Sequence, residues 1–178
     1  MPSKPLHAFL VTYLQSCRES GTSASEKGLK VSTEKLTGEN IIFFRTDCNE
    51  GRECLKLTNQ DNKVCDYLIY YSKDGKRSEI VCFLELKGTN LDDAAKQVTE
   101  TDEHIKLLLN ESIHTGHQNF IWRVCICLHN HAPSVNQRIR EKLKRKYGSN
   151  NVEIKHGVPR HNIGPFLRRA ISAEDHPN

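Results

Sequence analysis

The chain has 178 residues, of which 37% are hydrophobic and 27% are charged. This length supports one hydrophobic core rather than two, and the apolar content excludes a mainly disordered chain, so we expect a single domain over residues 1–178. The formal net charge of +4 is compatible with an anionic partner but is below the excess that marks a dedicated nucleic-acid-binding protein.

The seven cysteines are odd in number and several lie in apolar runs, which is typical of reduced core thiols rather than of a disulfide framework. No stretch approaches the apolar length of a membrane span, and the residues after Met1 do not resemble a secretory signal. We therefore expect an intracellular, cytoplasmic protein without a membrane partner, and association with a nucleoid or a nucleus stays open.

The first predicted element is a helix over residues 6–17, because apolar residues recur there at spacings of three and four. Residues 18–38 are rich in Ser, Thr, Gly, Lys and Glu and have few apolar anchors, so we interpret them as a connection that forms a mobile loop. A strand is predicted to start at residues 41–44.

Two runs rich in β-branched and aromatic residues follow, at residues 63–71 and 78–87. The Asp74-Gly75 pair between them is a strong signal for a hairpin turn, so the two strands should pair antiparallel.

Helical spacing then predicts a helix that begins at Leu91 and has Asn90 as its N-cap. Residues 120–128 are nearly all apolar, which indicates a central strand covered on both faces. The predicted order indicates an α/β fold with a mixed central sheet flanked by helices. Three further elements complete it: a helix at residues 134–147, a strand at 152–155 and a terminal helix near Pro165.

Three charged residues are expected to meet at one end of the hairpin. Glu85 and Lys87 lie two apart in a strand, so their side chains point to the same face. Asp66 lies near the start of the partner strand, which an antiparallel hairpin brings beside the end of the other. Two carboxylates converging there can hold Mg²⁺ or Mn²⁺, and a nearby ammonium can assist an attacking water.

This arrangement, an Asp followed by Glu85-Leu86-Lys87, resembles the signature of the PD-(D/E)XK nuclease superfamily. The resemblance implies a restriction-endonuclease-like core of helix, three strands, helix and strand. It implies that Asp66 and Glu85 bind Mg²⁺ or Mn²⁺, that the Leu86 carbonyl is a further candidate ligand, and that Lys87 assists the attacking water.

The chain departs from the family pattern at Cys65, where the signature has Pro, and at Thr101, where the RecB-like branch has Tyr four residues after a Gln. That Gln is Gln97 here, a candidate catalytic residue that would contact a substrate phosphate or the catalytic Lys87. Many members also carry a Glu on the first helix, for which Glu19 is the nearest candidate.

Each of these sites has a plainer alternative. Asp66, Glu85 and Lys87 could form a cross-strand salt bridge on an exposed face, but the apolar Val81 and Phe83 on the Glu85 face indicate burial, which favours a metal. Gln97 could equally be a polar residue on a solvated helix face.

A second triplet, Glu153-Ile154-Lys155, serves as an internal control. No acidic residue occurs between Ser112 and Arg140, so the strand upstream cannot supply a partner carboxylate to this triplet. A zinc site is also conceivable on the four alternating residues Cys125, Cys127, His129 and His131, but an extended strand separates them too widely, and we favour core cysteines and surface histidines.

Arg138, Lys142 and Arg145 form a stripe on the third predicted helix, which we expect to bind a nucleic-acid backbone; the alternative is a solvated face that complements the helix dipole. We therefore interpret the chain as a metal-dependent nuclease, an endonuclease or nickase with DNA expected ahead of RNA. An effector subunit of a mobile-element, repair or defence system is one setting for that activity. The alternative is an inactive nuclease-like module that binds nucleic acid or a protein partner. Specificity would come from a protein partner or a homodimer, because little chain remains beyond the core.

Overall fold

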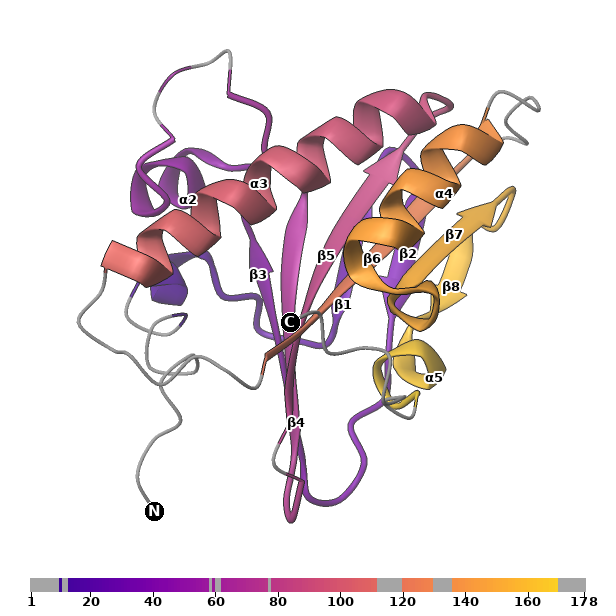
Figure 1. The fold of residues 1–178 in the computed structure, drawn as a ribbon. Coiled ribbons are helices and arrows are strands. Elements are labelled where there is room, and N and C mark those ends of the chain that lie inside the picture. The colour runs from indigo at the N-terminus through magenta and orange to yellow at the C-terminus, as the bar shows by residue number, and fades with distance from the viewer. Residues whose placement is uncertain are drawn as a thin grey trace.

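The computed structural model describes Leu10 and residues 13–57, 59, 62–76, 78–111, 120–129 and 136–169. These residues form a five-stranded sheet of order β3-β4-β5-β6-β7, a three-stranded sheet of order β1-β2-β8, and helices packed around them (Figure 1). Both sheets contain antiparallel and parallel pairs. The predicted α/β class with a mixed central sheet is therefore confirmed.

The large sheet starts with three consecutive antiparallel strands, β3 (Glu39–Arg45), β4 (Tyr67–Lys73) and β5 (Glu79–Lys87). The β4–β5 hairpin turns at Asp74-Gly75 as predicted, and Gly75 supplies the positive φ of 74° that the turn needs. The first of the two predicted hairpin strands begins later than expected, so Asp66 directly precedes β4 instead of lying within it.

Two parallel strands extend the sheet. β6 (Phe120–Leu128) lies parallel to β5, and β7 (Val152–His156) lies parallel to β6, so the predicted central position of the apolar run is confirmed. The exception in that run, Arg123, is fully buried, and its guanidinium donates to the Asn151 side chain and to the carbonyl oxygens of Phe166 and Arg169.

One face of the large sheet is covered by α3 (Leu91–Glu111) and α4 (Asn136–Tyr147) (Figure 1). The predicted cap at the start of α3 is confirmed, because the Asp93 amide donates to Asn90 Oδ1 at 3.1 Å. The core beneath these helices includes Phe83 of β5, whose ring stacks on Trp122 with the ring centroids 5.6 Å apart.

The other face carries the small sheet, formed by β1 (Ser23–Glu26), β2 (Leu29–Ser32) and β8 (Arg160–Asn162), together with α5 (Gly164–Leu167) (Figure 1). The interpretation of residues 18–38 as an unstructured connection was wrong, because this segment contains the β1–β2 hairpin. Its few apolar residues alternate along the two strands and pack into the second core cluster: Ala24, Leu29 and Val31.

The remaining elements lie near the N-terminus and in the connections. Leu10, Tyr13 and Leu14 are helical and η1 (Gln15–Cys17) follows them, while the rest of the predicted helix over residues 6–17 lies outside the described residues. Two short elements were not predicted, α2 (Asn49–Cys54) and η2 (Ser149–Asn151). The described part of α4 begins at Asn136, and residues 134 and 135 of the predicted helix lie outside the described residues. Among the helices described, none combines the length and the apolar character that crossing a bilayer requires.

Candidate functional site

The charged residues singled out in the sequence meet at one edge of the large sheet. Asp66 directly precedes β4, and Glu85 and Lys87 lie among the last three residues of β5. Because β4 and β5 pair antiparallel, with Tyr67 opposite Leu84, the beginning of one strand lies beside the end of the other. Asp66, Glu85 and Lys87 therefore lie together, as the sequence predicted.

The carboxylates of Asp66 and Glu85 are each held by a backbone amide of the opposite segment. The Asp66 amide donates to Glu85 Oε2 at 3.1 Å, and the Leu86 amide donates to Asp66 Oδ2 at 2.7 Å. Asp66 is 2% exposed and Glu85 is fully buried. The plainer alternative of an exposed cross-strand salt bridge therefore does not describe this pair. The role of the Leu86 carbonyl as a metal ligand stays a prediction.

The two buried carboxyls resist ionisation. Burial raises the pKa of Asp66 to about 7, against the opposing hydrogen bond from the Leu86 amide. Burial, and then the negative charge of Asp66, raise the pKa of Glu85 to about 8. Glu85 Oε1 is buried and has no hydrogen-bond partner. A buried oxygen without a donor, next to a second carboxylate, fits a site that accepts a cation.

Lys87 lies beside this pair, where three side chains contact its ammonium group. Its Nζ lies 3.6 Å from Glu85 Oε1 and 3.0 Å from Asp93 Oδ2, and it donates to Gln97 Oε1. Gln97 is fixed in turn, because its Nε2 donates to the Val64 carbonyl at 3.0 Å. Gln97 therefore contacts Lys87 as predicted, and it is largely buried instead of lying on a solvated face.

Asp93, in the first turn of α3, was missed as a site residue. Its carboxylate contacts both Lys63 and Lys87, and hydrogen bonds from these two lysines hold the pKa of Asp93 below its usual value. In the sequence, an acidic residue in the first turn of a helix is explained by the helix dipole alone, so the pattern gave no reason to assign Asp93 to Lys87.

The two departures from the family pattern contact each other. The Cys65 amide donates to Thr101 Oγ1 at 2.8 Å, and this hydroxyl donates to the Gln97 carbonyl at 2.7 Å. Both Cys65 and Thr101 are fully buried. Thr101 thus ties the segment that carries Asp66 to α3, a role of positioning and not of chemistry.

Glu19 does not lie on a helix. It follows η1, and its amide donates to the Phe43 carbonyl of β3 at 2.8 Å. Burial raises the pKa of the Tyr67 phenol, and the negative charge of Glu19 adds to this effect. The side chain therefore acts near Tyr67, the neighbour of Asp66.

The tip of the β1–β2 hairpin also reaches this edge. Lys27 and Gly28 form its turn with positive φ angles of 49° and 78°, and the His129 ring contacts the Lys27 carbonyl. The charge of Glu26 contributes to the raised pKa of Asp66. The sequence signals that could have revealed this hairpin are a Lys-Gly turn and the alternation of Ala24, Leu29 and Val31, but no local signal places it opposite Asp66.

The predicted basic stripe lies on the solvent face of α4. Arg138, Lys142 and Arg145 are exposed, and among the described residues no carboxylate forms an ion pair with Arg138 or Lys142. Lys142 also lines a groove between α3 and α4. The stripe is therefore available to an anionic partner, although its binding to nucleic acid stays a prediction.

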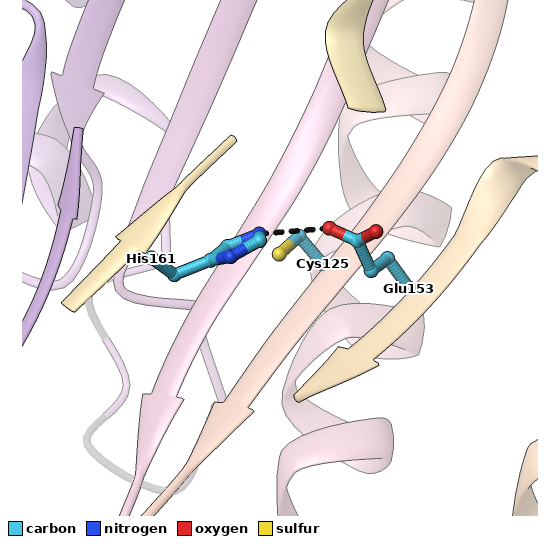
Figure 2. A group of neighbouring side chains, drawn as sticks. All are labelled: Cys125, Glu153 and His161. Atoms are coloured by element: carbon cyan, nitrogen blue, oxygen red, sulfur yellow. Dashed lines mark hydrogen bonds and ion pairs between the residues drawn. The ribbon is translucent and has the colours of Figure 1, made fainter. Parts of the chain in front are cut away.

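A second cluster lies at the join of the two sheets. Figure 2 shows Cys125 of β6, Glu153 of β7 and His161 of β8, whose ligand atoms lie within 4.8 Å of one another. His161 Nε2 is 2.8 Å from Glu153 Oε2, while Arg169 and Lys155 lie 3.4 and 3.6 Å from Glu153 Oε1. Although burial opposes it, the hydrogen bond from His161 lowers the pKa of Glu153.

Three cationic or polar partners thus already balance Glu153, and we interpret this cluster as an ion-pair network that joins β7 to β8. A hydrogen bond to Cys127, followed by burial, keeps the pKa of the Cys125 thiol well above its usual value. Cys125 and Cys127 are core residues as predicted, whereas His129 contacts the hairpin tip and His131 lies outside the described residues. Among the described residues, the group around Glu153 holds a thiol and an imidazole but no second carboxylate, as its use as a control requires.

Comparison of the chain with protein-family models, with curated proteins and with solved structures found no significant match.

Proposed function

We propose that this protein is a metal-dependent nuclease with a restriction-endonuclease-like core, which hydrolyses phosphodiester bonds of nucleic acid, with DNA as the expected substrate. The observation that carries the proposal is the buried pair of Asp66 and Glu85, in which Glu85 Oε1 lacks a hydrogen-bond partner and lies beside Lys87. The topology supports it, because three antiparallel strands are followed by α3 and a parallel strand.

The donor set of this pair suits Mg²⁺ or Mn²⁺, because both ions prefer oxygen ligands. Asp66 and Glu85 would hold the ion, with the Leu86 carbonyl as a further candidate. Without a cation, burial favours the neutral form of both carboxyls, as their raised pKa values reflect. A divalent cation would stabilise their charged form instead, which Lys87 alone does too weakly to restore ordinary pKa values.

A bound ion would supply a Lewis acid that lowers the pKa of water and offsets the charge of the phosphoryl group. Lys87 is kept in place by Asp93 and Gln97. From there its ammonium donates to the attacking water or to a phosphate oxygen, where it stabilises the charge that develops in the transition state. Gln97, anchored to the Val64 carbonyl, positions Lys87.

The basic stripe of α4 provides the contact to the substrate backbone in this proposal. α4 follows β6, whose carboxyl end adjoins the end of β5 that carries Lys87, with Leu128 opposite Lys87. Arg138, near the start of α4, is therefore nearest to that edge, and Lys142 and Arg145 continue away from it. Each lysine or arginine that neutralises a phosphate releases a counterion and adds to affinity without reading sequence.

The deciding experiment incubates the protein with linear, circular and single-stranded DNA and with RNA, in Mg²⁺, in Mn²⁺ and in EDTA. We expect cleavage of DNA with either metal and none in EDTA. Conversion of circular duplex DNA to its nicked form identifies a nickase, and conversion to the linear form identifies an endonuclease that cuts both strands. Cleavage that persists in EDTA would contradict the proposal.

Matched variants assign the activity to this site. Asp66→Asn and Glu85→Gln keep the shape of the side chains but remove the charges that hold a cation, so both should abolish cleavage. Glu153→Gln is the control, because Glu153 belongs to the other Glu-x-Lys triplet and contacts His161. Loss of cleavage with Glu153→Gln alone would mean that the wrong triplet was chosen.

A binding module without catalysis is the second candidate, favoured by one observation. The exposed stripe of α4 is built from residues that make no contact with Asp66 or Glu85 among those described, so it could bind nucleic acid independently of the metal site. Stable binding of DNA or RNA by a folded protein that cleaves neither in any metal would support this candidate.

A further inference from the structure

We propose that Cys125, Glu153 and His161 form a binding site for Zn²⁺ where the two sheets meet. This inference goes beyond the proposed function and does not rest on it, because none of the three residues belongs to the carboxylate pair of Asp66 and Glu85. A bound ion would fasten the small sheet to the large one.

The three ligands come from three different strands that the two sheets bring together. Cys125 of β6 lies opposite Glu153 of β7 in their parallel register, so the two side chains lie on the same face of the large sheet. His161 of β8 lies opposite Val31 of β2, which is fully buried in the core between the sheets, so the His161 ring shares that inner side. Figure 2 shows the three side chains converging from these strands.

The ligand atoms are close enough to share one ion. The Sγ of Cys125, a carboxylate oxygen of Glu153 and a ring nitrogen of His161 all lie within 4.8 Å of one another. Around a tetrahedral zinc ion, with bonds of about 2.0–2.3 Å, ligand atoms lie about 3.3–3.6 Å apart. Only small rotations of the side chains are therefore needed, and strands hold ligands more precisely than loops do.

The donor set favours zinc over the ions expected at Asp66 and Glu85. Thiolate and imidazole are ligands that Zn²⁺ prefers, and a carboxylate fills a third of its four positions, which leaves one for water. Mg²⁺ prefers oxygen ligands alone. A thiolate and a carboxylate together also balance the charge of a divalent ion, so the complex would add no net charge to the core.

The contacts around Glu153 can persist when an ion is bound. Its Oε2 is 2.8 Å from His161 Nε2, whereas Arg169 and Lys155 approach the other oxygen, Oε1, at 3.4 and 3.6 Å. Oε2 and the imidazole would turn to the ion while Oε1 keeps both cations as partners that orient the carboxylate. Cys125 is fully buried and the Glu153 and His161 side chains are slightly exposed, so an ion can enter from the solvent side.

This site lies on the opposite face of the large sheet from the carboxylate pair. Along β5, Phe83 packs beneath the helices, and Glu85 follows it on the same face two residues later. Along β6, Cys125 belongs to the core cluster on the side of the small sheet. The two sites should therefore bind metal independently, and Glu153→Gln should lose Zn²⁺ while it keeps cleavage.

The test adds Zn²⁺ or Co²⁺ to the full chain after metal has been removed and the thiols have been reduced, so it needs no catalytic activity. Calorimetry measures the affinity for Zn²⁺. Co²⁺ identifies the ligand, because Co²⁺ bound to a thiolate shows a charge-transfer band in the near ultraviolet. Both measurements are repeated in the double variant Asp66→Asn, Glu85→Gln, where we expect the same Zn²⁺ affinity and the same band.

Matched variants assign the ion to the three residues. Cys125→Ala, Glu153→Gln and His161→Gln should each weaken Zn²⁺ binding by more than about 100-fold, since loss of a group that only orients a ligand already costs about 10–100-fold. Cys127→Ala is the control, because Cys127 lies on the same face of β6 and is 1% exposed. It should keep the affinity and the band.

Thermal denaturation accompanies each titration, because an ion that binds the folded state raises its melting temperature. The His161 side chain reaches the surface, so His161→Gln keeps the test decisive if the core variant Cys125→Ala does not fold. An unaltered protein that binds no Zn²⁺, or a band that is unchanged in His161→Gln, would overturn the inference. So would Zn²⁺ that is lost in the double variant, since the ion would then belong to Asp66 and Glu85.

Discussion

The Asp66 amide donates to Glu85 Oε2, so the residue directly before β4 holds a carboxylate near the end of β5. The Leu86 amide returns the contact to Asp66 Oδ2. Neither carboxylate can therefore change rotamer without losing a hydrogen bond. In the proposed metal site this pair would be preorganised for a cation, because folding has already met the cost of bringing two acidic groups together.

The metal-free protein should lose stability as the pH rises. The pKa of Asp66 increases from 3.8 to about 7 on folding and that of Glu85 from 4.5 to about 8, so the folded state binds more protons than the unfolded state between these values. This contribution is fully present below about pH 4 and is lost as the pH rises through about 7 to 8. Thermal denaturation in EDTA from pH 5 to pH 8.5 measures it.

Two controls belong to this pH series. Asp66→Asn and Glu85→Gln cannot ionise at these positions, so each should flatten the decline. Added Mn²⁺ should reverse it, because a cation stabilises the charged carboxylates. An EDTA profile that rises toward pH 8 in the unaltered protein, and is unchanged in both variants, would contradict the assignment of these two groups.

Arg168→Met should destabilise the fold by about 3 kcal/mol, because it leaves a buried carboxylate without its cation. Arg168 Nε donates to Glu39 Oε1 and its Nη2 donates to Glu39 Oε2, both at 2.8 Å, and Glu39 is 3% exposed. Urea denaturation measures the change. The exposed ion pair of Lys96 and Asp92 offers the contrast, since Lys96→Met should leave the midpoint unchanged.

The ion pair between Arg168 and Glu39 also predicts a loss of stability at acid pH. The hydrogen bond from Arg168 lowers the pKa of Glu39 from 4.5 to about 2. Its stabilising contribution is therefore present above about pH 4.5 and is lost as the pH falls toward 2. Arg168→Met should remove this part of the pH dependence of stability. An acid denaturation curve that is identical in the variant and the unaltered protein would show that Arg168 does not stabilise the charged form of Glu39.

Lys87→Met should abolish cleavage and leave Mn²⁺ bound, because an ammonium offers no lone pair to a metal. Gln97→Ala should cleave at a rate between that of Lys87→Met and that of the unaltered protein, because Lys87 keeps Asp93 as a partner. We expect its single-turnover cleavage to be about 10–100-fold slower than that of the unaltered protein. Calorimetry and single-turnover assays on the same samples check both statements. Loss of Mn²⁺ binding in Lys87→Met would mean that Lys87 holds the carboxylates and not the substrate.

Charge reversal of Arg138, Lys142 and Arg145 together should weaken binding to duplex DNA and reduce the slope of log K against log salt by about 3, about one unit for each lost phosphate contact. Metal binding should not change. Filter binding over a salt series gives the slope, and reversal at Lys30, Lys56 and Lys73, which are also exposed, serves as the control. Equal slopes in both triple variants would mean that the stripe on α4 is a solvated helix face that does not bind DNA.

Local patterns were enough to predict the pair at the centre of the site. Strand alternation placed Glu85 beside Lys87, and the Asp74-Gly75 turn brought Asp66 to them. The apolar run 120–128 was recognised as the inner strand because both of its faces are covered.

The parts that could not be predicted depend on contacts between distant segments. β2 pairs with β8 as well as with β1, so the strand Lys30–Ser32 depends in part on residues 160–162, which the local composition does not reveal. Asp93 acquires Lys63 and Lys87 only when α3 packs. The Ser-rich and Lys-rich composition of residues 18–38 is also typical of a loop, so the sequence alone did not reveal that the segment pairs as strands.

The pairing of β2 with β8 also sets an order of events during synthesis. β8 is formed by Arg160–Asn162, and the buried Arg123 finds the carbonyl oxygens of Phe166 and Arg169 still later in the chain. A ribosome releases these residues long after Glu26, Asp66 and Glu85 have emerged. The small sheet therefore cannot be completed on a partly made chain, because β2 must wait for β8.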